Sequence, residues 1–205
     1  MFSIFKIFKK KKIVPHIRLS GVIGAVGKFK QGLDFAGQKE IIEKAFSIKK
    51  ALAVAVSVNS PGGSPVQSHL IYSYIRKQAK KNKKRVLVFA EDVAASGGYL
   101  IACAGDEIYA NSSSIVGSIG VIYSSFGLQE LIKKAGIERR VYTAGKNKST
   151  LDPFVEEKKE DVERLKKIQL ELHSDFIKVV EDSRFSKLKK DGNPDLFTGE
   201  FWSGS

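Results

Sequence analysis

Three short segments of this 205-residue chain combine a serine or a lysine with glycines, and the first surrounds Ser96 in residues 93–99, VAASGGY. Ser96 stands between small residues where a loop after a predicted strand enters a predicted helix. Substrate can approach such a serine, and the N–H groups of a helix N-terminus can stabilise developing negative charge. The setting therefore suits a nucleophile. Serine is equally a common helix N-cap, so the segment alone leaves both interpretations open.

The second segment, NSPGG at residues 59–63, follows a predicted buried strand. Paired glycines allow backbone N–H groups to point into a cavity without an obstructing Cβ, as an oxyanion hole requires. A plain tight turn explains the same residues. A glycine-rich loop can also bind phosphate, but neither a dinucleotide-binding GxGxxG nor a P-loop pattern is present.

The third segment, TAGKNKST at residues 143–150, contains Lys146 and Lys148. A lysine acts as a general base only as the neutral amine, and burial away from water favours that form. Two lysines in one loop are otherwise ordinary solvated charges. The segment by itself does not decide between a base and a solvated loop.

The remaining candidates for catalysis are weaker. His16, His69 and His173 are scattered, lie outside the glycine-rich loops and show no metal-ligand spacing, although a Ser-His-Asp triad stays possible because triads are spatial. Cys103 lies in an apolar stretch and is expected in the core. It is the only cysteine, so no intrachain disulfide forms. No metal or other cofactor is expected.

The composition, 42% hydrophobic and 28% charged, is typical of a globular domain, and the formal net charge is +13. Much of the positive charge lies in lysine-dominated runs rather than in interleaved arginines and aromatics, which argues against a nucleic-acid partner. Residues 1–12, MFSIFKIFKKKK, are too short to span a membrane and lack the features of a signal peptide. They are either a flexible tail or a short anchor at a membrane surface.

The apolar patterns predict strands that alternate with helices, which indicates a largely parallel sheet in one domain of residues 13–205. The predicted strands are residues 13–23, 51–58, 85–90, 107–110, 120–123 and 138–143. The predicted helices are residues 33–48, 66–79, 96–104, 128–135 and 162–179.

Four segments together resemble the signal peptide peptidase A family of Ser/Lys peptidases, including its SohB-type members. They are NSPGG at 59–63, ASGGY at 95–99, GSIGV at 117–121 and AGKNKSTLDPF at 144–154, and the resemblance extends from about residue 17 to the end of the chain. It implies an α/β fold of the crotonase and Clp-protease type, with repeated β-β-α units, a largely parallel sheet and flanking helices. Relatives continue into a further helix and strand, so the family pattern is expected to be incomplete here.

The resemblance also implies a site. Ser96 matches the nucleophile, and Lys148 matches the general base of a G-x-x-K-S pattern that begins at Gly145, with Lys146 as the alternative. Ser118 matches the residue that orients the lysine, and the N–H groups of Gly63 and Gly97 would form the oxyanion hole.

The expected activity is endopeptidase cleavage of signal peptides or other membrane-associated peptides. Single-domain relatives form homo-oligomers whose active sites take the serine and the lysine from neighbouring subunits, and the same is expected here. The expected location is peripheral at the bacterial inner membrane, with the cytoplasm as the alternative. Two other functions stay open: a non-catalytic membrane-associated assembly protein, and an acyl-CoA-processing enzyme on the same scaffold.

Overall fold

The computed structural model describes residues 13–24, 32–188 and 196–205. The chain forms two compact units. Unit 1 comprises the chain up to Gly120 and from Phe176 onward, and unit 2 comprises Val121–Asp175. The N-terminal segment 1–12 that was considered as an anchor lies outside the described residues.

Unit 1 is built on a mixed sheet in which every strand pairing except the last is parallel. β3 pairs with β2 on one side, and on the other with β4 and then, further along, with β5. β6 lies antiparallel to β5 at the edge. The strands are β1 (His16–Ser20), β2 (Ala53–Ser60), β3 (Arg85–Ala95), β4 (Glu107–Ala110), β5 (Ile115–Gly117) and β6 (Phe201–Ser203).

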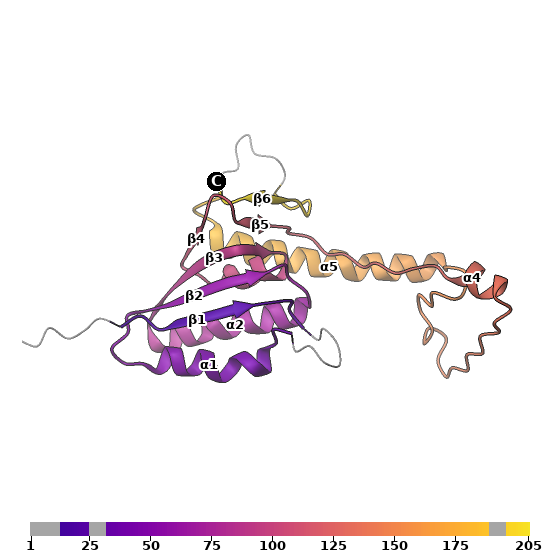
Figure 1. Cartoon of the computed structure of the whole chain (residues 1–205), viewed down its shortest axis with the longest axis horizontal. Coiled ribbons are helices and arrows are strands. Elements are labelled where there is room, and N and C mark those ends of the chain that lie inside the picture. Colours follow the sequence, from indigo (N-terminus) through magenta and orange to yellow (C-terminus); the bar gives the residue numbers. More distant parts are fainter. Residues whose placement is uncertain (1–12, 25–31, 189–195) are drawn as a thin grey trace, which may run out of the picture. The chain divides into compact units, whose positions relative to one another are not determined.

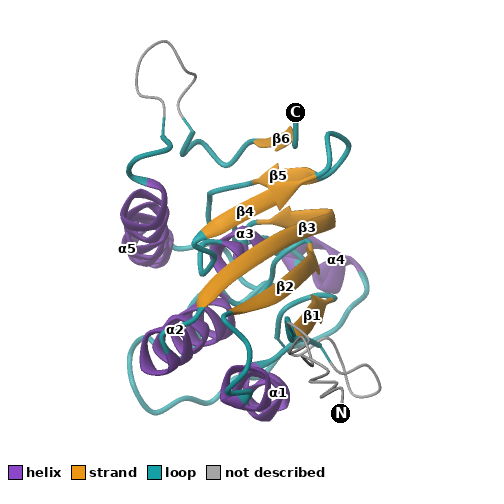
Figure 2. Ribbon diagram, turned by 90° about the vertical axis from the view of Figure 1, so that its left-hand side faces the viewer, coloured by secondary structure: helices purple, strands orange, loops and turns teal. Residues whose placement is uncertain are grey.

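Helices pack on one face of this sheet because alternate strand residues on that face are apolar. β1 is buried at Ile17 and Leu19, and β2 and β3 bury valines in the same way. These side chains form one core with residues of α1 (Phe35–Ser47), α2 (Pro65–Asn82) and α3 (Gly97–Ala102). Figure 2 shows α1 and α2 lying along the same side of the sheet.

A second, smaller cluster joins α3 to the part of the long helix α5 (Lys159–Arg184) that belongs to unit 1. Leu100 and Cys103 of α3 pack there against Phe176 and Val180. Burial raises the pKa of the Cys103 thiol to about 11, so the thiolate is disfavoured. Cys103 is thus a core residue, as the sequence predicts.

Unit 2 holds the helix α4 (Gln129–Lys134), α5 as far as Asp175, and the loop between the two helices. The loop leads through a turn that contains Lys148. Much of the apolar surface of this unit is exposed, including Ile122, Phe126 and Tyr142, whose relative exposures are 87%, 82% and 90%.

Most predicted elements are present within a few residues of their expected ends, and the mixed α/β class with a mostly parallel sheet is confirmed. The strands predicted at 120–123 and 138–143 are wrong: both segments are described and neither is a strand. A strand requires a hydrogen-bonded neighbour, and neither segment is paired with one in the described part of unit 2. Close to the first of these segments the strand is instead β5, which lies a few residues earlier in the chain and pairs with β3.

Among the described residues, no helix is both long enough and apolar enough to cross a membrane.

Candidate active site

Ser96 lies between the end of β3 and the start of α3, where the chain turns sharply. Its backbone has φ 52° and ψ −124°, a positive φ that L-residues rarely adopt. The turn is fixed on both sides, because the Ser96 N–H donates to the Gly117 carbonyl at 2.8 Å and the Ser96 carbonyl accepts from the Leu100 N–H at 3.0 Å. The serine occupies the N-cap position, but its hydroxyl makes no capping hydrogen bond. The half-buried hydroxyl therefore remains available for chemistry.

The glycine loop after β2 lies directly against Ser96. A Cβ built on Gly62 would stand 2.7 Å from the Ser96 Cβ and 2.8 Å from the Gly97 nitrogen, so no larger residue fits without movement. Gly62 also has φ 100°, which favours glycine. The sequence motifs predict a role for Gly63 of this loop but not for Gly62, the glycine that approaches Ser96.

Two N–H groups have no protein acceptor in the described part of the chain: that of Gly97, which follows Ser96 directly, and that of Gly63, which follows Gly62 in the loop. The Gly62 N–H, by contrast, donates to Ser60 Oγ at 3.1 Å. Gly97 is the first residue of α3, and a Cβ on it would stand 2.3 Å from Ser68 Oγ of α2. Unengaged N–H groups next to a nucleophile are what an oxyanion hole needs.

Ser118 lies one residue beyond the carbonyl that binds the Ser96 N–H. It has φ 55°, and its own N–H donates to the Glu200 carbonyl at 2.6 Å. The preceding Gly117 packs against the ring of Trp202, since a Cβ there would stand 2.6 Å from that ring. The chain segment that contains β6 thus fixes the turn at Ser118, a contribution that the sequence patterns did not reveal.

Lys148 belongs to unit 2, so the structure describes it apart from Ser96, Gly63, Gly97 and Ser118, all of which lie in unit 1. Lys148 is exposed in a turn in which its N–H donates to the Gly145 carbonyl at 3.1 Å. The other candidate base, Lys146, is exposed in the same loop.

The lysine loop is anchored through Asp152. The Asp152 carboxylate accepts from Ser149 Oγ at 3.2 Å, from the Phe154 N–H at 3.0 Å and from Arg139 at 2.8 Å. The Phe154 N–H and the Arg139 guanidinium hold the pKa of Asp152 below its usual range. Arg139 also lies over the ring of Phe154, 4.7 Å from its centroid. The residue after Lys148 is thus tied to a charged network.

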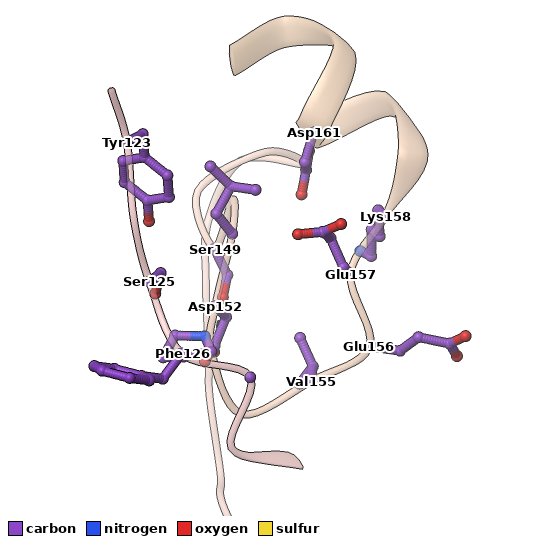
Figure 3. Close-up of a pocket in the computed structure, with 13 residues that line it drawn as sticks. Tyr123, Ser125, Phe126, Ser149, Asp152, Val155, Glu156, Glu157, Lys158 and Asp161 are labelled. Atoms are coloured by element: carbon purple, nitrogen blue, oxygen red, sulfur yellow. Dashed lines mark hydrogen bonds between the residues drawn. The ribbon is translucent and has the colours of Figure 1, made fainter. Parts of the chain in front are cut away.

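A small pocket of about 100 Å³ opens beside this anchor in unit 2. Figure 3 shows Ser149 and Asp152 close together, Val155 on the segment that leads to Glu156, and Asp161 on the first turn of α5. Phe126 and Tyr123 also line the pocket. The pocket brings apolar and acidic side chains close to the lysine loop.

The alternatives from the sequence gain no geometric support in unit 1. His16 is at the start of β1, where its ring contacts Ser57 Oγ, whereas Ser96 follows the end of β3. His69 lies on α2 against Tyr72.

Comparison with known proteins places the chain in a family. The family model for peptidase family S49 matches residues 78–205, which include Ser96, Ser118 and Lys148. A protease named SohB from Buchnera aphidicola subsp. Schlechtendalia chinensis is 33% identical over 82% of this chain and 53% of its own length. The chloroplastic serine protease SPPA of Arabidopsis thaliana is 35% identical over 60% of this chain and 19% of its own.

A further relative carries a different name. A Na(+)/H(+) antiporter NhaA of Brucella melitensis is 59% identical over 94% of this chain, and the match occupies 26% of that protein. The chain therefore spans about a quarter of the antiporter-named relative and about half of SohB. Among solved structures, a ClpP1 variant from Listeria monocytogenes aligns over 92% of this chain and 82% of its own, with a TM-score of 0.47 and 13% identity.

Proposed function

The chain belongs to peptidase family S49, the signal peptide peptidase A family, and on that premise we propose that it is a serine endopeptidase with a Ser96/Lys148 dyad. The observation that carries the proposal is the geometry at Ser96. A strained turn presents a hydroxyl that caps no helix; the Gly97 N–H, which follows it in the chain, and the Gly63 N–H, in the glycine loop that lies against Ser96, have no protein acceptor among the described residues. Such a constellation suits acyl transfer.

In the proposed reaction, neutral Lys148 takes the proton from Ser96 Oγ as this oxygen bonds to the substrate carbonyl carbon. The N–H groups of Gly63 and Gly97 stabilise the oxyanion of the tetrahedral intermediate. The C–N bond then breaks, and the lysine ammonium returns its proton to the leaving amine. Water attacks the acyl-enzyme with Lys148 again accepting the proton. The ester bond to Ser96 Oγ then breaks, the lysine ammonium protonates Oγ, and the acid is released.

We further propose that the lysine comes from a neighbouring copy of the chain in a homo-oligomer. Lys148 is exposed in the single chain, whereas a lysine base must be shielded from water. Unit 2 carries exposed apolar side chains that a second subunit would cover, among them Phe126 and Tyr142. In this arrangement Ser118 orients the lysine, and residues 13–205 form the peptidase domain.

The proposed substrates are signal peptides or other membrane-associated peptides, and the proposed location is peripheral at the bacterial inner membrane. The name of the Brucella relative supports a membrane setting, because an antiporter works in a membrane. The chain matches about a quarter of that protein.

The first test is labelling with a fluorophosphonate, which forms a covalent bond with an activated serine, followed by mass spectrometry of the adduct. Labelling of Ser96 is expected in the wild type, and its loss in Ser96→Ala and Lys148→Ala. Lys146→Ala is the matched control from the same loop and should retain labelling. A wild type that is folded and oligomeric but unlabelled would support the assembly protein instead, and labelling that survives Lys148→Ala would remove the dyad.

The shared site has its own test. Ser96→Ala and Lys148→Ala chains are mixed, dissociated and reassembled, and peptide cleavage is measured. If sites are shared, some contain an intact serine from one chain and an intact lysine from the other, so activity returns in the mixture. No recovery in mixed oligomers, verified by native mass spectrometry, would place both residues in one chain.

A further inference from the structure

The sheet of unit 1 has an end opposite the one at which Ser96 lies. β1, β2 and β3 are parallel, so their amino termini lie at one end of the sheet and their carboxyl termini at the other. Figure 1 shows the arrows of these strands starting together. Three chain segments meet at the end of the sheet where these strands start: residues 13–15 before β1, 48–52 before β2, and the end of α2 with the start of β3.

Hydrogen bonds hold these segments side by side. The Ala55 N–H donates to the Pro15 carbonyl at 2.9 Å, and the Arg85 N–H donates to the Leu52 carbonyl at 3.2 Å. Lys84 Nζ donates to the Ile48 carbonyl at 2.6 Å. The side chains that these segments expose therefore form one continuous surface.

This surface is strongly positive. The chain contains no acidic residue between Glu43 and Glu91, a stretch that includes the lysines before β2 and at the end of α2. Two acidic residues lie at this end of the sheet, and each forms a salt bridge: Asp106 with Arg76, and Glu107 with Arg85. Six lysines of this surface are exposed and form no ion pair in the described part of the chain: Lys49, Lys50, Lys77, Lys80, Lys81 and Lys83.

Apolar side chains project among these lysines. Leu52 is 82% exposed, and Val14 and Ile13 are 55% and 43% exposed. Exposed aliphatic side chains surrounded by lysines match the boundary of a bilayer, where acyl chains meet charged headgroups. We call these three residues and the six lysines the basal surface.

We propose that the basal surface docks on an anionic lipid bilayer, and that it does so as part of the folded domain. Charge complementarity and the exposed aliphatic residues favour lipid over nucleic acid, since the surface is lysine-rich and has no aromatic residue on which bases could stack. The described chain also begins at this surface, and the segment of residues 1–12 that precedes it is apolar and basic in sequence. The proposal does not depend on the peptidase reaction.

The test is co-sedimentation of the full chain with vesicles of phosphatidylcholine and phosphatidylglycerol, and with vesicles of phosphatidylcholine alone. The basal variant is Lys50→Glu with Lys80→Glu and Lys81→Glu. The matched control has the same change in net charge at exposed lysines elsewhere: Lys39→Glu with Lys166→Glu and Lys178→Glu. To separate the contribution of residues 1–12, both sets are repeated with Lys9, Lys10, Lys11 and Lys12 changed to Gln.

The wild type should bind the anionic vesicles in a salt-sensitive way and bind phosphatidylcholine weakly. The basal variant should partition at least about tenfold less, and the control within about twofold of wild type, in both backgrounds. Equal losses in the two variants, no loss in the basal variant, or binding to a DNA duplex without binding to vesicles would each overturn the proposal. Thermal melting verifies folding, and Ser96 labelling is read separately, so a failure of the peptidase proposal leaves the vesicle result interpretable.

Discussion

Ser96 is held in a conformation that costs a non-glycine residue on the order of 1–3 kcal/mol. The surrounding contacts impose it: the Ser96 N–H is bound by the Gly117 carbonyl, and Gly62 lies against the serine Cβ. Strain of this kind at a reactive side chain fixes its direction before substrate arrives. The conformation of Ser96 is therefore expected to depend on Gly62.

The change Gly62→Ala tests this dependence. A methyl group would stand 2.7 Å from the Ser96 Cβ in a backbone conformation with φ 100°, so Ser96 or the glycine loop must shift. We expect kcat/KM and the rate of fluorophosphonate labelling to fall by about 100-fold, comparable to the loss of an oxyanion-hole donor. Gly127→Ala is the control, since a methyl group there meets nothing within 4 Å, and it should leave labelling unchanged. Wild-type labelling in Gly62→Ala would contradict the role of the close approach.

At the scale of single residues, the features that depend on neighbouring sequence alone could be predicted. Small residues around Ser96 and the glycines of the loop are visible as patterns, and the structure gathers Ser96, Gly63, Gly97 and Ser118 at one end of the sheet region. Their catalytic roles stay predictions. The approach of Gly62 to Ser96 was not predictable, because it depends on how β2 and β3 end side by side.

β6 stabilises the turn at Ser118 although it is only three residues long. It pairs with β5, and the Trp202 ring covers Gly117 while the Glu200 carbonyl binds the Ser118 N–H. The change Trp202→Ala removes this cover. We expect about 1–2 kcal/mol of lost stability for a half-buried aromatic side chain, measured by denaturant unfolding, together with a loss of activity larger than the unfolded fraction explains.

The control for Trp202 is its neighbour Phe201, which is 66% exposed. Phe201→Ala should change both stability and activity less than Trp202→Ala does. Equal effects of the two changes would indicate that β6 only completes the sheet.

The loop that carries Lys148 is the second element with a testable anchor. In Asp152→Asn the charge that holds Arg139 is lost, together with part of the acceptor for Ser149 and the Phe154 N–H. We expect kcat to fall about tenfold with little change in KM, because the change displaces Lys148 but leaves the residues that bind the substrate in place. Glu156→Gln, an exposed acid in the same loop, is the control.

The pH dependence of this anchor follows from the lowered pKa of Asp152. A carboxylate whose pKa is lower in the folded chain stabilises the fold above its unfolded pKa of about 4. That contribution is lost as the pH falls through the folded value. The mobility of the loop, followed by NMR, should therefore stay constant from neutral pH down to about 4 and increase only in stronger acid. An increase already near pH 6 would contradict the assignment.

The elements that the sequence predicted incorrectly share a physical cause. Residues 120–123 and 138–143 have apolar and β-branched content, but no neighbouring strand pairs with them in the described structure of unit 2. β5 and β6 escaped prediction because three residues are too few to show a period. Propensity is local, whereas strand pairing is decided by chain segments far apart in sequence.

At the scale of the whole molecule, the exposed apolar residues of unit 2 form the surface that we propose a second subunit covers. Phe126 and Tyr142 are 82% and 90% exposed. Phe126→Asp with Tyr142→Asp should dissociate the oligomer, as measured by light scattering, and abolish Ser96 labelling in a chain that stays folded. Ile41→Asp, on an exposed site of α1, is the control and should change neither. An oligomer that survives the double change would move the interface elsewhere.

β3 connects the two ends of the sheet. Its first residue, Arg85, lies at the basal surface, and its last residue, Ala95, directly precedes Ser96. Its 11 residues span roughly 35 Å at about 3.3 Å per residue. With the basal surface on a bilayer and β3 along the membrane normal, the nucleophile stands that far above the headgroups. A peptide still anchored in the same membrane must then extend about ten residues beyond it to reach Ser96. The length of one strand would thereby set a minimum tail length for cleavage and spare proteins whose chains end closer to the lipid.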